Sequence, residues 1–461
     1  MKNNIEQAFE KLFPYYLDQL KELVKIPSIS FDHFDVQEVL RSAESVKELF
    51  EKAGFSKAQF LMPPSGKPSV YAELMVSPSH PTILLYAHHD VQPEMRRELW
   101  QSDPFLPEER DGRLYGRGTA DDKAGIIVHL AAVSLARELW GKNAPNFKFL
   151  IEGEEEAGSS GLEVLLAEHK DLLKADAVIV ADLNNIEKGT PCITTSLRGM
   201  SAIEVTLSST ETPLHSGSWS GPIPDPAQAL CRVITSLTNE QGDIVIEGFY
   251  DDIIPPTAEE LDSYSKLPLG ASIFKKDSHL LENVALLVKE SEIPLALWRR
   301  PSIVITALES GNKKIAGNVL QNTAYARISI RLAPGMDAER STQKLIDHIQ
   351  KNIPYGLHAT IEKESGAGPF TTNTNHPYFQ KMKEAMTEAF NKEAKFIGCG
   401  ASIPGAVLFR ETFGEIPILL IGLEDPESNP HSENESLDLA DFKKTMIAET
   451  LFFGKLASEN T

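Results

Sequence analysis

Short apolar runs that end in polar residues are the feature that most restricts how this chain can fold. They lie at residues 69–76, 82–90, 146–154 and 176–183. Helical patterns that begin at Lys123 and Ser160 separate the last three runs. Strands that alternate with helices form an α/β layer in which the strands run largely parallel. We therefore expect an α/β fold built on a mostly parallel sheet.

The first fifty residues have a helical pattern. Apolar residues between Val36 and Phe50 fall on one face, and Gly54 is suited to the left-handed cap that ends many helices. Pro14 lacks the backbone N–H that a helix interior requires, so we expect it to interrupt an earlier helical stretch.

The pattern of apolar and polar residues changes after residue 199. SAIEVTLSS and AYARISIRLAP alternate apolar and polar residues, as strands with one wet face do. Helical patterns lie near residues 226–238 and 337–352. Residues 240–300 are rich in acidic residues and proline, and we expect them to form an irregular extension.

From about residue 370, a helical pattern, the apolar run IPILLIGL and a last helical pattern restore the α/β character. A chain of 461 residues also exceeds the ~100 to 200 residues of one usual domain. We expect a discontinuous α/β domain over residues 1–199 and 369–461, with an inserted α+β domain over residues 200–368.

Charge and cysteine content exclude several classes of protein. Forty-five Lys plus Arg stand against 66 Asp plus Glu, and the net charge of -21 repels nucleic acids and anionic membranes. No run reaches the ~20 apolar residues of a membrane span, and the N-terminus lacks the apolar core of a signal peptide. The three cysteines are few, odd in number and far apart, which fits a reducing compartment. We expect a cytoplasmic protein.

Residue types that bind metals gather at the ends of the strand-like runs. The candidates are His88, His89, Asp90, Glu154, Glu155, Glu156 and Asp182. Asp121 and Asp122 precede a helical pattern, and His431 lies in a late loop with the sequence NPHSENE. Open parallel sheets place their ligand sites beyond the carboxyl ends of the strands, so these residues are expected to converge.

Histidines combined with several carboxylates suit Zn²⁺, with Mn²⁺ or Co²⁺ as alternatives. Five or six such ligands exceed the need of one catalytic zinc. Two metals that share a carboxylate at a spacing of ~3.5 to 4 Å lower the pKa of the water between them. A carboxylate that binds no metal can then take the proton of this water.

The motifs, taken together, resemble the M20 family of metallopeptidases. They are YAHHDVQP, LYGRGTADDKAG, EGEEEAGSS, VADLNN, LHSGSWSG and PHSENE, in this order along nearly the whole chain. The stretch LWQSDPFLPEERDGRLYGRG and the later LHSGSWSGPIPDPAQAL are most similar to the carnosinase-like dipeptidase branch.

The resemblance implies a role for each matching residue. His88 is a metal ligand, and Asp90 is the carboxylate that orients it. Asp121 is the ligand that bridges two metals, and in this family the peptide bond after it is often cis. Glu155 is the general base, and Glu156 is a ligand.

The later motifs supply the remaining residues. Asp182 joins His88 and Asp121 on one metal, and His431 joins Asp121 and Glu156 on the other. His215 is implied to stabilise the oxyanion, often across a dimer interface. Arg331 and Ser402 resemble residues that bind the C-terminal carboxylate of the substrate, a task that suits the planar fork of arginine.

The implied protein is a homodimeric, dinuclear metal-dependent hydrolase that cleaves dipeptides or short peptides with a metal-bridged water and Glu155 as base. Residues 1–199 and 369–461 form its catalytic domain, and residues 200–368 form a lid and dimerisation domain. The nearest alternative is an N-acyl or N-succinyl amino acid amidohydrolase of the same family, for which a free substrate amine does not matter. A noncatalytic metal-binding protein is a further alternative, and the joint presence of Asp90, Glu155 and His215 argues against it.

Overall fold

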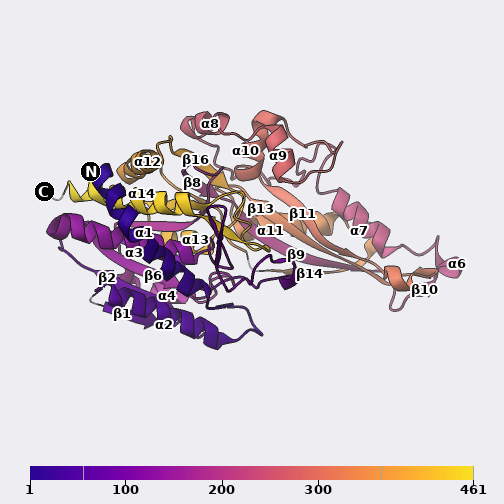
Figure 1. Ribbon diagram of the computed structural model, residues 1–461. Coiled ribbons are helices and arrows are strands. Elements are labelled where there is room, and N and C mark those ends of the chain that lie inside the picture. The colour runs from indigo at the N-terminus through magenta and orange to yellow at the C-terminus, as the bar shows by residue number, and fades with distance from the viewer. Residues whose placement is uncertain (56, 365, 460–461) are drawn as a thin grey trace. The chain divides into compact units, whose positions relative to one another are not determined.

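The computed structural model describes residues 1–55, 57–364 and 366–459 (Figure 1). The chain divides into two compact units. Unit 1 comprises Met1–Thr195, Thr372–Ile397 and Pro404–Thr461, and unit 2 comprises Ser196–Thr371 and Gly398–Ile403. The sequence placed the domain boundaries at 199/200 and 368/369. Each unit is described on its own below.

A sheet of nine strands among the described residues lies mostly in unit 1, although its strand β15 falls within the residues of unit 2. Its strand order is β1-β2-β6-β3-β7-β17-β8-β15, and β16 pairs with β8. The four middle strands β6, β3, β7 and β17 run parallel to one another, and the flanking strands are antiparallel. The bounds are β1 Lys57–Leu61, β2 Ser69–Leu74, β3 Thr82–His88, β6 Asn146–Glu152, β7 Ala177–Asn184, β8 Cys192–Leu197, β15 Phe370–Thr371, β16 Lys395–Cys399 and β17 Ile418–Glu424. The expected α/β fold with a mainly parallel central sheet is confirmed.

Helices cover both faces of this sheet. On one face α3 packs against β3, α14 and α1, and α14 also packs against α12, while α4 and α13 pack together on the other face. The bounds are α1 Lys2–Val24, α2 Val36–Lys52, α3 Lys123–Trp140, α4 Leu162–Glu168, α5 Lys170–Leu173, α12 Pro377–Phe390, α13 Pro404–Phe413 and α14 Leu439–Ala457. A small sheet in the order β18-β5-β4 contains Ser436–Asp438, Arg113–Tyr115 and Glu108–Arg110.

Alternating side chains of β3 pack against the helices on the two faces of the sheet. Ile83, Leu85 and Ala87 are fully buried in the large core of unit 1. On the opposite face, the ring of Tyr86 contacts the ring of Phe409 from α13 at 5.2 Å between centroids. Because both faces are apolar, the strand is fixed in place up to its last residue, His88.

Helix α3 is the central helix of the core. Lys123–Asn143 is long and apolar enough to cross a membrane by length and composition, although we expected no run of that kind. However, 67% of its apolar window is buried inside the structure, as in the core helix of a globular domain.

The expectation that Pro14 interrupts the first helix is wrong. Helix α1 continues from Lys2 to Val24 with Pro14 inside it. The buried residues Phe9, Tyr16 and Leu17 lie on both sides of the proline. Their burial against the core outweighs the loss of the helical hydrogen bond that the proline cannot donate.

Unit 2 contains a four-stranded antiparallel sheet in the order β11-β13-β9-β14, on which α7 and α11 pack. A two-stranded pair, β10 and β12, lies with α6 at the end of this unit away from α8, α9 and α10 (Figure 1). The strands are β9 Gly199–Ser208, β10 Leu214–His215, β11 Ser302–Glu309, β12 Val319–Leu320, β13 Thr323–Leu332 and β14 His358–Lys363. The helices are α6 Ser216–Trp219, α7 Pro226–Thr235, α8 Ala258–Ser265, α9 Ala271–Asp277, α10 Ile293–Trp298 and α11 Ala338–Asn352.

Residues 240–300 contain three short helices, where the sequence analysis expected irregular structure. Helix α8 begins with a capping box, in which Thr257 accepts a hydrogen bond from the Glu260 N–H and the Glu260 side chain bonds the Thr257 N–H. This Thr-x-x-Glu pattern is a helix signal that the sequence analysis overlooked.

A buried histidine–glutamate pair joins the layers of unit 1, and we predict that it contributes to stability. His129 Nδ1 of α3 lies 2.8 Å from Glu449 Oε1 of α14, and His129 Nε2 lies 3.0 Å from the carbonyl oxygen of Tyr86. Glu449→Ala removes one partner of a fully buried pair and is expected to lower the free energy of unfolding by about 3–5 kcal/mol.

Glu384→Ala is the matched control, because Glu384 is 63% exposed and pairs with Lys455 of α14 at the surface. We expect this control to change the free energy of unfolding by less than ~1 kcal/mol. Chemical denaturation of both variants measures the difference. Equal destabilisation by the two substitutions would contradict the prediction.

Candidate metal centre

The candidate ligands are positioned by the carboxyl ends of the parallel strands. His88 is the last residue of β3, Asp182 lies near the end of β7, and Glu156 follows β6. Asp121 lies just before α3. A cis peptide bond joins it to Asp122, which is the N-cap residue of that helix. His431 lies in the loop after β17. Parallel strands end at the same edge of a sheet, so these residues meet there.

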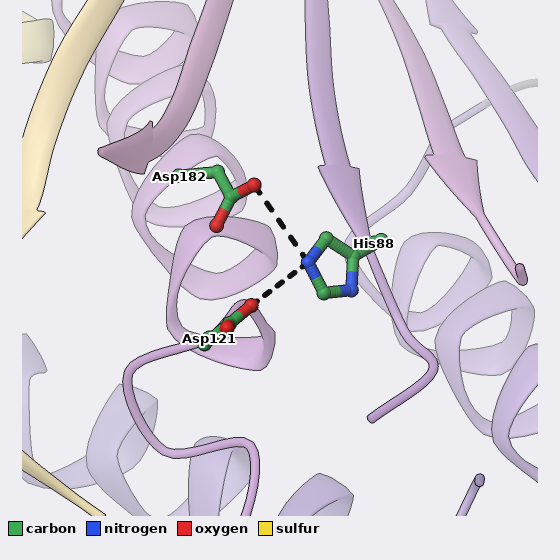
Figure 2. A group of neighbouring side chains, drawn as sticks. All are labelled: His88, Asp121 and Asp182. Atoms are coloured by element: carbon green, nitrogen blue, oxygen red, sulfur yellow. Dashed lines mark ion pairs between the residues drawn. The ribbon is translucent and has the colours of Figure 1, made fainter. Parts of the chain in front are cut away.

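The first group of side chains contains His88, Asp121 and Asp182. His88 Nε2 lies 3.0 Å from Asp121 Oδ1 and 3.8 Å from Asp182 Oδ2. Figure 2 shows the two carboxylates pointing at this ring nitrogen, which belongs to the strand end. One potential ligand atom from each residue lies within 4.8 Å of the other two.

The second group contains Asp121, Glu156 and His431. His431 Nε2 lies 3.0 Å from Asp121 Oδ2 and 3.1 Å from Glu156 Oε2. Asp121 therefore faces the first group with one carboxylate oxygen and the second group with the other. This is the arrangement that a carboxylate bridging two metals requires.

Asp90 holds two parts of the site in place. Its carboxylate accepts hydrogen bonds from Ser30 Oγ at 2.6 Å, from the Glu155 N–H at 3.2 Å and from the Glu156 N–H at 3.0 Å. His88 Nδ1 lies 3.4 Å from Asp90 Oδ1 and 3.1 Å from the Asp90 carbonyl oxygen. Asp90 was expected to orient His88, but no sequence signal indicated that it also holds the turn that contains Glu155 and Glu156.

The three consecutive glutamates have different surroundings. Glu154 accepts a hydrogen bond from the Gly161 N–H at 2.7 Å and stabilises the turn. Glu156 accepts from Gln92 Nε2 at 2.8 Å and also faces His431. Within the described part of the chain, the Glu155 carboxylate has no hydrogen-bond partner, so it remains available to a substrate or a water molecule.

The buried carboxyl groups strongly influence one another. Burial, together with the charges of Asp122 and Asp121, raises the pKa of Asp182 well above its usual value. Burial, together with Glu156 and Asp121, raises the pKa of Glu155 to about 8. This concentration of acidic groups at a buried edge requires protons or cations to offset it.

The pKa values of His88 and His431 are both raised. Burial lowers the pKa of His88, but the carboxylates of Asp121 and Asp90 outweigh it and raise that pKa above its ordinary value. Hydrogen bonds to Asp121 and Glu156 raise the pKa of His431 to about 11. A metal ion would replace these protons, because a ligand imidazole binds metal in its neutral form.

These residues fit a divalent metal. His88 Nε2 is buried and has no hydrogen-bond partner in the described part of the chain, although two carboxylates lie next to it. Two imidazoles and three carboxylates are the donor set that Zn²⁺ and neighbouring metals accept. The other ring nitrogen of His88 is already held by Asp90, as is usual for a metal ligand.

The remaining candidates belong to unit 2. His215 is exposed at the end of β10, where it pairs with Val319 and its Nδ1 lies 3.4 Å from Ser218 Oγ. Arg331 lies in β13 opposite Ser302. Ser402 Oγ donates a 2.7 Å hydrogen bond to the Arg198 carbonyl oxygen.

Arg198 is a further candidate that the sequence analysis did not single out. Its Nη1 lies 3.3 Å from Ser302 Oγ, and Ser302 pairs with Arg331 in the neighbouring strand. Burial and the nearby Arg331 lower the pKa of Arg198 to about 10. Neither arginine has an ion-pair partner among the described residues, so this part of unit 2 is suited to an anion. The only sequence signal was its position beside the strand SAIEVTLSS.

Other residues at the edge of the sheet also escaped the sequence analysis. The Asp122 carboxylate accepts hydrogen bonds from the His88 N–H and the Gly125 N–H, both at 3.2 Å, and so joins β3 to α3. Glu435 and Arg117 are buried, and Glu435 accepts hydrogen bonds from the Asp121 N–H and from Arg117. Both stand inside motifs that the sequence analysis quoted, LYGRGTADDKAG and PHSENE, but position in a motif alone does not predict a partner.

Comparisons with known proteins agree with this geometry. The model of the family described as "Peptidase family M20/M25/M40" matches residues 84–451. A cysteinylglycine-S-conjugate dipeptidase from Corynebacterium striatum is 34% identical over 376 residues, which cover 81% of this chain and 80% of the relative.

Two solved structures are similar over nearly the whole chain. Human carnosine dipeptidase 1 is 28% identical with a TM-score of 0.82, and the match covers 99% of each chain. Sso-CP2, an M20 family metallo-carboxypeptidase from Sulfolobus solfataricus, is 28% identical with a TM-score of 0.84, and the match covers 96% of this chain and 99% of the other.

The protonated histidines predict how metal binding depends on pH. A metal must displace the protons that the neighbouring carboxylates hold on His88 and His431, so binding strengthens as pH rises towards the raised pKa values. We expect Zn²⁺ or Mn²⁺ to raise the melting temperature of chelator-treated protein, and to raise it more at pH 8 than at pH 6. Thermal melts with and without metal measure this. A larger increase at pH 6, or none at either pH, would contradict the site.

Proposed function

Because the chain belongs to peptidase family M20/M25/M40, we propose that it hydrolyses the peptide bond of dipeptides and short peptides at a pair of divalent metal ions. Membership in this family makes the protein a metallopeptidase, and the resemblance to its carnosinase-like dipeptidase branch is confirmed. The observation that carries the two-metal proposal is the shared Asp121, whose two oxygens face two separate groups of ligands.

The residues of each group would hold one ion. His88, Asp121 and Asp182 form one set, and Asp121, Glu156 and His431 form the other. When bound, the two ions supply positive charge that polarises the substrate carbonyl and lowers the pKa of a water molecule. Zn²⁺ is the ion that we propose, and the same ligands also accept Mn²⁺ or Co²⁺.

Glu155 is the proposed general base. Its carboxylate has a raised pKa of about 8 in the metal-free protein, and the main chain of this turn is held by Asp90. Glu155 takes a proton from the attacking water and then delivers it to the amine that leaves. Glu156 is less suited to this task because Gln92 and His431 already occupy its oxygens.

Residues of unit 2 are proposed to complete the site. His215 would donate a hydrogen bond to the developing oxyanion, and Arg331 with Ser402 would bind the C-terminal carboxylate of the substrate. The absence of an acidic partner for Arg331 in the described chain supports the second role. Residues 200–368 would act as a lid and as the surface of a homodimer, and a cytoplasmic location remains part of the proposal.

The names of similar proteins favour dipeptides as substrates over acylated amino acids. Relatives are called cysteinylglycine-S-conjugate dipeptidase and beta-Ala-His dipeptidase. We expect chelator-treated protein reloaded with Zn²⁺ or Mn²⁺ to release amines from free dipeptides such as Cys-Gly and β-Ala-His. N-acetylated dipeptides and N-succinyl amino acids should be poor substrates. Turnover of the acylated compounds alone would place the protein among the amidohydrolases of the family.

The role of Glu155 predicts a specific loss of activity. Glu155→Gln preserves the size of the side chain but removes the base, and we expect kcat to fall by about 10²- to 10⁴-fold. Metal content, measured by elemental analysis, should remain unchanged because Glu155 is not in either ligand group.

Glu163→Gln is a matched control in the following helix, where Glu163 is exposed. It should retain full activity. Substantial turnover by Glu155→Gln would assign the base to another residue.

A further inference from the structure

Glu435 is a fully buried carboxylate next to the metal centre, with four N–H donors around it. Oε2 accepts from Arg117 Nη1 at 2.6 Å and from the Gly118 N–H at 3.1 Å. Oε1 accepts from the Ala120 N–H at 2.9 Å and from the Asp121 N–H at 3.2 Å. Both oxygens are therefore used, and three of the four donors belong to the turn that carries the shared ligand.

Three N–H groups of this turn depend on Glu435 for an acceptor. The N–H groups of Gly118, Ala120 and Asp121 are directed at Glu435, and the described chain offers them no other acceptor. The turn is also tightly confined, because a Cβ atom on Gly118 would lie 2.7 Å from Val91. Buried N–H groups without an acceptor are unfavourable, so the conformation of the turn depends on the carboxylate.

The same carboxylate is connected to the loop that carries His431. Arg117, which is fully buried, donates to the Ser432 carbonyl at 3.0 Å and to the Pro93 carbonyl at 3.1 Å. The Gly116 N–H donates to the Glu435 carbonyl at 3.0 Å. This connection matters because the His431 side chain is 55% exposed and its described ion-pair contacts are to the ligands Asp121 and Glu156.

We propose that Glu435 is a positioning residue for both metal ions. It places the Asp121 carboxylate between the two groups of ligands, and with Arg117 it sets the loop from which His431 approaches. The inference rests on the metal centre proposed above. It goes beyond that centre because Glu435 lies in neither ligand group and touches no reacting atom.

A negative charge is essential to this role. In Glu435→Gln one oxygen becomes an NH₂ group. Its N–H bonds then face the N–H groups from which the carboxylate accepted hydrogen bonds. The side chain keeps its size, so the core is not left with a cavity. The turn must then shift, and Asp121 moves with it.

The test is the metal affinity of the full-length, chelator-treated protein, measured with Zn²⁺ in competition with a chromophoric chelator. We expect Glu435→Gln to weaken both binding steps by about 10- to 100-fold, because Asp121 is common to the two sites. Glu427→Gln is the matched control, with the same change of charge in the same loop on a side chain that is 75% exposed. It should bind within about twofold of the wild type.

A second variant separates positioning from folding. Glu435→Asp keeps the charge but withdraws the carboxylate by one methylene, and we expect an intermediate loss of affinity with a native near-ultraviolet circular dichroism spectrum. Wild-type affinity in Glu435→Gln would overturn the inference. Failure of both Glu435 variants to fold without metal would also overturn it, since Glu435 would then serve the fold alone. If the wild-type protein itself binds no metal, the proposed function falls instead.

Discussion

The sharing of one carboxylate between two histidines is the interaction on which the site depends. Asp121 presents one oxygen to His88 and the other to His431, although these histidines are separated by most of the chain. The cluster also contains Asp182, Glu155 and further buried acids, whose pKa values are raised by burial and by one another. Such a group is costly without compensating positive charge. Divalent ions would supply that charge, and the geometry of Asp121 explains why two are proposed.

The surrounding main chain, more than the residue types, assigns the roles at this edge. Glu154, Glu155 and Glu156 are chemically alike, yet one stabilises a turn, one has no hydrogen-bond partner among the described residues and one faces His431. Asp90 fixes this difference because it accepts the N–H groups of the second and third glutamates. A rigid support of this kind allows one carboxylate to act as a base while its neighbour binds metal.

Much of this arrangement could be predicted from the sequence. Polar residues after apolar runs located His88 and Asp182 at the ends of parallel strands, because that pattern follows directly from sheet geometry. Pro14 was misjudged since local propensity does not include the core that α1 buries. Glu435 was missed for a similar reason, because its donors lie more than three hundred residues away and no local pattern indicates them.

Anomalous diffraction from crystals soaked with Zn²⁺ or Mn²⁺ tests the two-metal centre most directly. The account predicts two anomalous peaks ~3.5 to 4 Å apart, with Asp121 between them. One peak should lie beside His88 and Asp182, and the other beside Glu156 and His431. A single peak that leaves one of these groups empty, or peaks elsewhere in the protein, would contradict it.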